Sequence, residues 1–99
     1  MRIHMAIKLF GVTCKAVTAV YGNGATALLI KDAVTGEPMA TASVNVPGIS
    51  EHLAKDECII KTYSENEGIL EELERAHVVA RTPKQVPTGL INCPIVRIL

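Results

Sequence analysis

Aromatic residues are nearly absent from this chain of 99 residues, which has no tryptophan, one phenylalanine and two tyrosines: Phe10, Tyr21 and Tyr63. Hydrophobic residues still make up 48% of the sequence, so the core must be built from Ile, Leu, Val and Ala. Binding of single-stranded nucleic acid uses aromatic side chains as stacking platforms within a basic groove. Since aromatics are few and the basic residues are dispersed, we do not expect direct nucleic-acid binding.

An excess of one charge is also missing, because ten Lys and Arg balance ten Asp and Glu. No overall field therefore directs the protein to a nucleic acid or a membrane surface. No apolar run approaches the ~20 residues of a membrane-spanning helix. Lys8 and Lys15 interrupt the apolar segment 5–20, which we interpret as a strand rather than a secretion signal. We expect no membrane contact and a cytoplasmic location.

The chain has only three cysteines, Cys14, Cys58 and Cys93. Their number is odd, they lie far apart, and no two form a CxxC motif. This spacing argues against a disulfide framework and against a structural zinc site, and it suits a reducing compartment. We therefore interpret the three cysteines as small core residues. The sequence predicts no metal and no cofactor.

The patterns that are present predict an α+β fold over residues 1–99, forming one domain. We expect a mainly antiparallel sheet of about five to six strands with one principal amphipathic helix packed on it. Residues 12–20 alternate in polarity with a period of two, as a half-buried strand does. Gly22-Asn23-Gly24 then predicts a type I′ hairpin turn into a strand over 26–31.

The clearest alternation lies in residues 40–46, which predict a single strand. Ala40, Ala42, Val44 and Val46 would share its buried face, and Thr41, Ser43 and Asn45 the solvent face. Residues 58–62 predict a buried strand. Pro83 and Pro87 would bracket an irregular loop, and Pro94 in a strand over 90–99 predicts an edge position or a bulge.

The principal helix should begin at Ser64, because Ser64 and Glu67 have the spacing of a capping box. Ile69, Leu70, Leu73 and Ala76 fall on one apolar stripe at helical spacing. The acidic side chains Glu65, Glu71, Glu72 and Glu74 would occupy the exposed remainder of the helix.

Catalytic motifs are missing from the sequence. His4, His52 and His77 are isolated, and the helical glutamates are explained by a solvated face. Gly22-Asn23-Gly24 follows a strand but does not open a helix, so it does not fit a phosphate-binding loop. The sequence favours a protein that is not an enzyme.

Two groups of residues are candidates for binding. Glu65, Glu71, Glu72 and Glu74 concentrate negative charge and could meet a basic partner surface. Asn23, Thr41, Ser43 and Asn45 could instead form a shallow polar pocket for a small ligand. For both groups a solvated surface is the simpler explanation.

Several spaced motifs resemble a family of small bacterial proteins known only as a domain of unknown function, encoded mostly on phages and plasmids. The motifs are Tyr21–Gly24, Thr35–Pro38, Ala40–Asn45 and Ile60–Gly68, and the similarity extends through Pro87–Gly89 and Val96–Leu99. His77 stands where the family pattern has glycine, at a position expected to take positive φ. The resemblance implies a mobile-element setting and no particular activity.

The leading functional hypothesis is a non-enzymatic binding protein of a mobile genetic element. It would act on a host protein or complex, for example as an anti-CRISPR-like inhibitor of bacterial defence. One alternative is a small-ligand or nucleotide-binding module that sequesters its ligand. The other is an accessory protein of plasmid or phage maintenance. A homodimer is compatible with all three.

Overall fold

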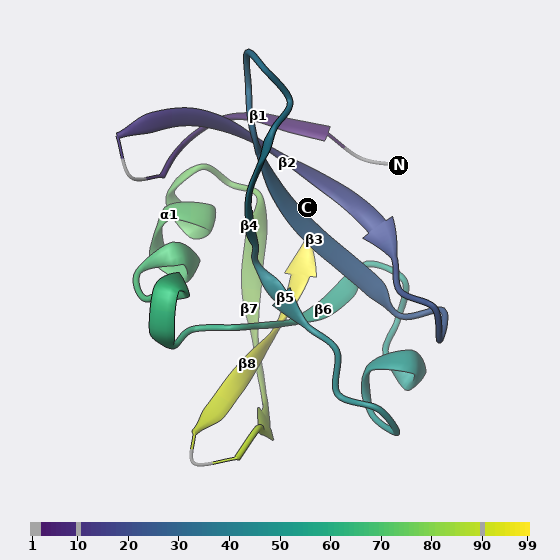
Figure 1. The fold of residues 1–99 in the computed structure, drawn as a ribbon. Coiled ribbons are helices and arrows are strands. Elements are labelled where there is room, and N and C mark those ends of the chain that lie inside the picture. The colour runs from purple at the N-terminus through teal and green to yellow at the C-terminus, as the bar shows by residue number, and fades with distance from the viewer. Residues whose placement is uncertain (1–2, 10, 90) are drawn as a thin grey trace.

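Two antiparallel sheets of four strands and one α-helix form the computed structural model, which describes residues 3–9, 11–89 and 91–99 (Figure 1). The first sheet has the order β1-β2-β3-β4 and the second β5-β6-β8-β7. The strands are β1 (Ile3–Leu9), β2 (Val12–Val20), β3 (Thr26–Asp32), β4 (Pro38–Thr41), β5 (Ser43–Val44), β6 (Glu57–Ile60), β7 (Val79–Pro87) and β8 (Asn92–Ile98). The α+β class with mainly antiparallel strands is confirmed. The single sheet of five to six strands is wrong.

The error arises at Ala42, where the predicted strand over 40–46 divides into β4 and β5. The Ala42 amide donates to the Leu28 carbonyl of β3 at 2.8 Å, and its carbonyl accepts from the Lys61 amide after β6 at 2.9 Å. Ala42, which is fully buried, therefore pairs with the first sheet through its amide and with the second sheet through its carbonyl. The polar row does not share a solvent face either, because Ser43 is only 3% exposed while Thr41 is exposed.

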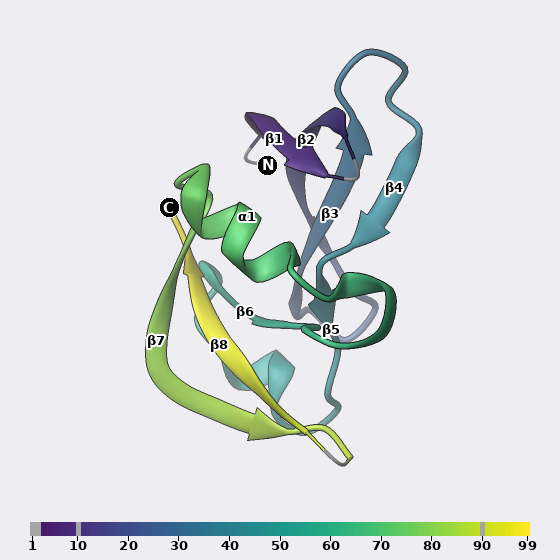
Figure 2. The ribbon, with the colours of Figure 1, turned by 90° about the vertical axis from the view of Figure 1, so that its left-hand side faces the viewer.

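Helix α1 (Ile69–Arg75) lies beside the two sheets and packs against β1 and β7 (Figure 2). Its predicted apolar stripe is confirmed, since Ile69, Leu70 and Leu73 are buried and Ala76 packs against them. These side chains join one aliphatic core with residues of both sheets, among them Ile7, Cys14, Leu28, Ile30, Cys58, Ile60, Val79, Val96 and Ile98. Within the described residues, no helix is long and apolar enough to cross a membrane.

The helix does not begin with the predicted capping box. Ser64 opens a 3₁₀ turn, Ser64–Asn66, with no side-chain cap, and α1 starts only after Gly68 at φ 86°. A capping serine needs extended backbone, whereas Ser64 has the left-handed φ of 60°. No side-chain cap forms, and the Glu67 amide donates to the Ser64 carbonyl at 3.2 Å instead of to its hydroxyl.

The helix ends as the sequence predicted. His77 has φ 59°, its amide donates to the Glu74 carbonyl, and the Val78 amide donates to the Leu73 carbonyl. This pair of bonds is the Schellman motif, in which the left-handed position usually holds glycine. The buried side chains of Val78 and Leu73 belong to the same core cluster and close the motif.

Turn chemistry differs from prediction between β2 and β3. The Gly24 amide donates to the Tyr21 carbonyl and the Tyr21 amide to the Ala25 carbonyl, so the loop has three residues. Gly24 has φ 88°, but Gly22 and Asn23 do not have positive φ. A type I′ turn requires positive φ at both central residues, so that prediction is wrong and a glycine bulge replaces it.

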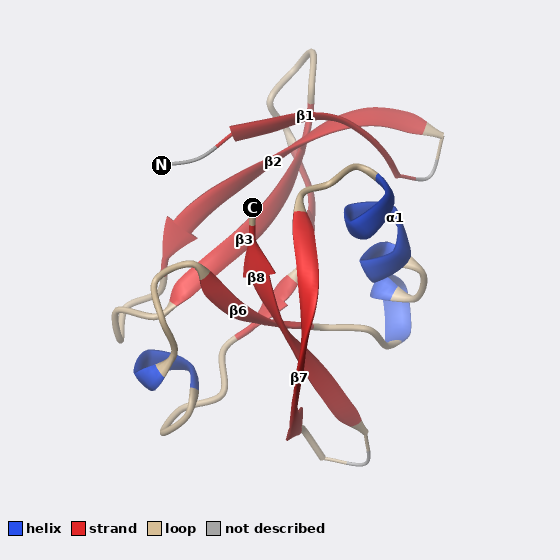
Figure 3. Ribbon diagram, turned by 180° about the vertical axis from the view of Figure 1, so that it is seen from behind, coloured by secondary structure: helices blue, strands red, loops and turns tan. Residues whose placement is uncertain are grey.

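Residues 83–87 are not the predicted irregular loop but belong to the long strand β7, seen next to α1 from behind (Figure 3). β7 is the edge of its sheet and pairs with β8, with a register shift between Arg81 and Gln85 that accommodates Pro83. Pro94 lies in β8, an inner strand, so its predicted edge position is wrong. It pairs with Gln85 directly after the irregular stretch, consistent with the predicted bulge.

Candidate functional site

A hollow of about 570 Å³ opens where the first sheet passes into the second. Both tyrosines of the chain line it, although they are 42 positions apart. Strands β4 and β5 form one wall, and the segment from Lys61 to Asn66 forms another. We call it the tyrosine hollow and define it by Tyr21, Ser43, Asn45, Lys61, Tyr63 and Asn66.

Ser43 fixes the floor of the tyrosine hollow. Its hydroxyl oxygen accepts a hydrogen bond from the Leu28 amide at 2.9 Å and lies 2.7 Å from the Tyr21 hydroxyl. The serine thus completes the hydrogen bonding of β3 at the point where β4 has ended. Because a buried amide without a partner is costly, Ser43 is a structural residue as well as a lining residue.

Asn66 is the most unusual group in the hollow because it is polar and only 2% exposed. Its side-chain amide nitrogen donates to the Thr41 carbonyl at 2.7 Å, which fixes the orientation of the carboxamide. Among the described residues, no donor reaches the Asn66 Oδ1 oxygen. Buried polar atoms are nearly always hydrogen-bonded in proteins, so this oxygen, on a residue that lines the hollow, is a candidate acceptor for a bound molecule.

Lys61 and Glu65 carry the charges of the hollow and neutralise each other. The Lys61 ammonium lies 2.7 Å from a Glu65 carboxylate oxygen and 5.3 Å from the centre of the Tyr63 ring. The hydrogen bond from Lys61 lowers the pKa of Glu65 to about 2, with help from its own backbone amide and the Ser64 hydroxyl. The same hydrogen bond raises the pKa of Lys61. A cation at this distance over a ring is also attracted to the ring face.

The residues predicted for a ligand pocket are brought together. Thr41, Ser43 and Asn45 all line the tyrosine hollow, and Asn23 touches it through a 3.1 Å hydrogen bond from its Nδ2 to the Asn45 Oδ1. The Asn23 Oδ1 accepts from the Ala25 amide, so Asn23 ties the hairpin loop to the wall. Thr41 of β4 and Ser43 of β5 thus reach the hollow from different sheets rather than from one strand face, whereas Asn23 contacts it only through Asn45.

Sequence reasoning missed Tyr21, Lys61, Tyr63 and Asn66. The usable signal was the scarcity of aromatics, since both tyrosines stand next to motifs singled out above. A left-handed, non-glycine residue, Ser64, lies beside Tyr63 in the lining segment. Such strained residues concentrate at ligand-binding positions.

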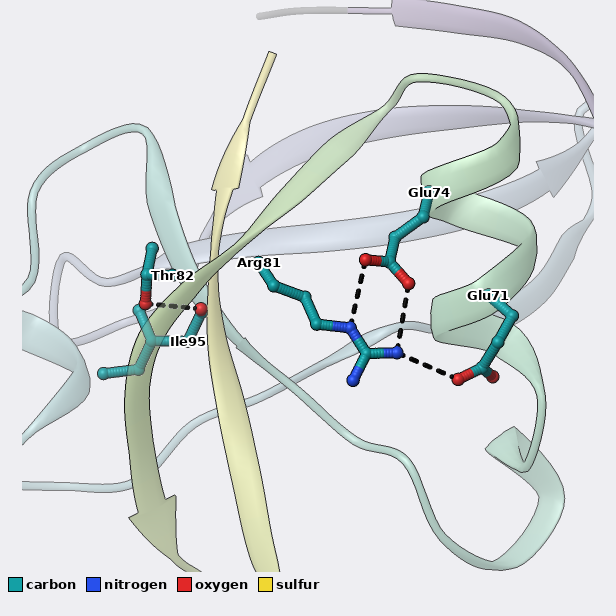
Figure 4. A network of polar contacts seen from close by, with 5 residues as sticks. All are labelled: Glu71, Glu74, Arg81, Thr82 and Ile95. Atoms are coloured by element: carbon teal, nitrogen blue, oxygen red, sulfur yellow. Dashed lines mark hydrogen bonds and ion pairs between the residues drawn. The ribbon is translucent and has the colours of Figure 1, made fainter.

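The acidic group predicted for partner binding is spread over α1 and the turn before it, and each glutamate has a cation within the chain. Arg81 of β7 binds both Glu71 and Glu74, with nitrogen–oxygen distances of 3.0 to 3.1 Å (Figure 4). Arg75 pairs with Glu72, and Lys61 with Glu65. The hydrogen bond to Glu74 is the main reason why the pKa of Arg81 is raised. The like charges of the helix are therefore already offset within the chain, and partner binding by these glutamates stays a prediction.

The three cysteine thiols are buried away from solvent. Cys14, Cys58 and Cys93 are free and buried, as expected for core residues. Burial raises the pKa of Cys58 to about 12, and burial together with the Asp32 carboxylate raises that of Cys14. Within the part of the chain that the structure describes, no cluster of three His, Cys, Asp or Glu could hold a metal ion.

Comparisons with known proteins return no match: no family model, no curated protein and no solved structure is significantly similar to the chain. The resemblance to the phage- and plasmid-borne family therefore stays a prediction. The cytoplasmic location and the homodimer stay predictions as well.

Proposed function

We propose that the protein acts by binding, without catalysis, and that a small polar ligand binds in the tyrosine hollow. Asn66 carries this proposal, because this buried residue lines an open hollow and its Oδ1 oxygen lacks a donor among the described residues. Small-molecule sites typically occupy about 300 to 1,000 Å³ and combine apolar walls with a few placed polar groups. The hollow has that size and that mixture of groups.

Purification from the native host in the absence of denaturant tests the proposal. We expect a small molecule to co-purify with the wild-type chain and to be lost with Tyr63→Leu, as measured by mass spectrometry of the bound fraction. Glu71→Gln is the matched control, because Glu71 lies on α1 and does not line the hollow. Equal recovery of the molecule with Tyr63→Leu would contradict the site.

The second candidate is the mobile-element protein that binds a host protein, with the anti-CRISPR-like inhibitor as its concrete form. One observation favours its acidic surface: the Glu65 and Glu71 side chains are 65% and 58% exposed despite their ion pairs. A basic partner could therefore replace Lys61 and Arg81 as the ion-pair partners of these glutamates, and its binding would weaken as salt concentration rises. The same purification separates the two, since a large partner lost with the double variant Glu71→Lys, Glu72→Lys would favour this candidate. A role in plasmid or phage maintenance rests on the resemblance alone.

A further inference from the structure

The tyrosine hollow has a chemical preference that narrows its ligand. We infer that it binds an uncharged planar molecule with an N–H donor on its edge, namely a nucleobase or nucleoside, and that it disfavours the corresponding nucleotide. This inference rests on the function proposed above.

The first argument is hydrogen bonding at Asn66. One amide hydrogen goes to the Thr41 carbonyl, which leaves the Oδ1 oxygen and a second N–H for a ligand. A carboxamide that keeps both an acceptor and a donor matches a molecular edge with the opposite pair. Base edges present such pairs, and Asn is a common partner of adenine for this reason.

The second argument is charge. Lys61 and Glu65 are the only ionic side chains that line the hollow among the described residues, and they are already paired at 2.7 Å. A phosphate would have to draw Lys61 away from Glu65 and then lie beside an unpaired carboxylate. A neutral ligand leaves the pair intact and, with it, the cation above the Tyr63 ring.

The third argument is the nature of the walls. Tyr21, Tyr63 and Met39 line the hollow, and because the Lys61 ammonium lies over the Tyr63 ring, we assign stacking to Tyr21. Bases stack on aromatic side chains whatever their sequence, because every base has a π face. The chain carries two tyrosines and one phenylalanine in total, so placing both tyrosines here commits most of its aromatic surface to one site.

The scarcity of aromatics also supplies the test. The two tyrosine rings give the only tyrosine signals in a ¹H–¹³C aromatic NMR spectrum, and both come from the hollow. We expect adenosine, guanosine, cytidine or uridine to shift these signals saturably, and the matching 5′-monophosphate to bind at least ~tenfold more weakly. Lys61→Met should widen that gap, because it leaves the Glu65 carboxylate unpaired beside the phosphate, whereas Glu65→Gln should narrow it by freeing the Lys61 ammonium.

Three results would overturn the inference in distinguishable ways. A monophosphate that binds as tightly as its nucleoside would show that the ligand is charged. Shifts caused only by other small fragments, such as acetate, phosphate or methylammonium, would retain the hollow as a site but replace the ligand class. If neither nucleosides nor a panel of such fragments moved either tyrosine signal, both the nucleoside ligand and the proposed small-ligand function of the hollow would be rejected.

Discussion

The acidic face of α1 and the tyrosine hollow differ in how their polar groups are satisfied. On α1, each of Glu71, Glu72 and Glu74 has an arginine partner within the chain. In the hollow, the buried Asn66 has an oxygen that no described donor reaches. The helix thus concentrates charge, but its glutamates are paired. The hollow has almost no net charge, but it contains a buried oxygen without a hydrogen-bond donor among the described residues.

This difference shows why charge along a sequence is a poor guide to a binding site. Arg81 follows Glu71 by ten positions and reaches it only because β7 runs beside α1. An unmet hydrogen bond in a buried position is a stronger indication, since its cost has to be offset by something. The predictions below test both halves of this comparison.

The largest effect is expected for Leu73→Ala, because the apolar stripe rather than the ion pairs should hold α1 in place. Leu73 is 0% exposed and packs in the main core cluster. We expect a loss of about 3 kcal/mol in the free energy of unfolding, measured by urea denaturation. Glu72→Ala on the same helix is the control and should cost below ~0.5 kcal/mol. Equal losses would mean that the charges anchor the helix.

Ser43→Ala should cost about 2 kcal/mol, because it leaves the buried Leu28 amide without its acceptor. Thr41→Val is a matched control on the same wall, at an exposed position where loss of the hydroxyl should be nearly neutral. Denaturation midpoints of the two variants give the comparison. If Ser43→Ala proved as mild as its control, the serine would only line the hollow and would not complete β3.

The sequence predicted much of the fold correctly where local chemistry decides the outcome. The strand at 12–20, the apolar stripe of α1 and the left-handed His77 follow from patterns within a few residues. The division of 40–46 into two strands does not, because the alternation continues unbroken through Ala42. Only the pairing of Ala42 with residues 28 and 61, far along the chain, shows that the sheet changes there.

The candidate site was half predictable for a similar reason. Asn23, Thr41, Ser43 and Asn45 were recognisable as small polar groups near a turn. Asn66 was not, because an asparagine next to two glutamates in a polar segment gives no sign of burial. Its position depends on the left-handed turn at Ser64, where a capping serine was expected.

His77→Gly should raise the free energy of unfolding by about 1 kcal/mol, since glycine adopts the left-handed region without steric cost. The gain should leave ligand-induced shifts of the tyrosine signals unchanged, because His77 does not line the hollow.

Ser64→Gly removes a similar cost within the lining segment, and we expect it to weaken binding by loosening Tyr63 and Asn66. If both variants bound ligand equally well, the left-handed backbone at Ser64 would not be needed for ligand binding.

Arg81→Gln should cost about 0.5 kcal/mol at low salt and less at high salt, as exposed ion pairs usually do. Arg81 is half exposed and lies 3.0 to 3.1 Å from its two glutamates. Urea denaturation at two ionic strengths measures the effect, with Lys84→Gln as the control because its Glu57 contact is longer, at 3.5 Å. A loss that does not depend on salt would indicate that Arg81 contributes packing rather than charge.

The smallest effect concerns the charged pair at the hollow. Glu65 has a pKa of about 2 in the folded chain against an ordinary value of 4.5, chiefly because Lys61 donates to it. Between those values the unfolded chain binds more protons than the folded chain, so the stability from this pair is present above pH 4.5 and is lost as pH falls toward 2. NMR titration of the Glu65 carboxyl carbon should give the low midpoint directly.

In Lys61→Met the midpoint should move up toward the ordinary value, although the backbone amide and Ser64 still hold it somewhat below. A midpoint that stays near 2 in the variant would show that Lys61 is not the partner of Glu65 in solution, and the ammonium would then be free to bind an anionic ligand in the hollow.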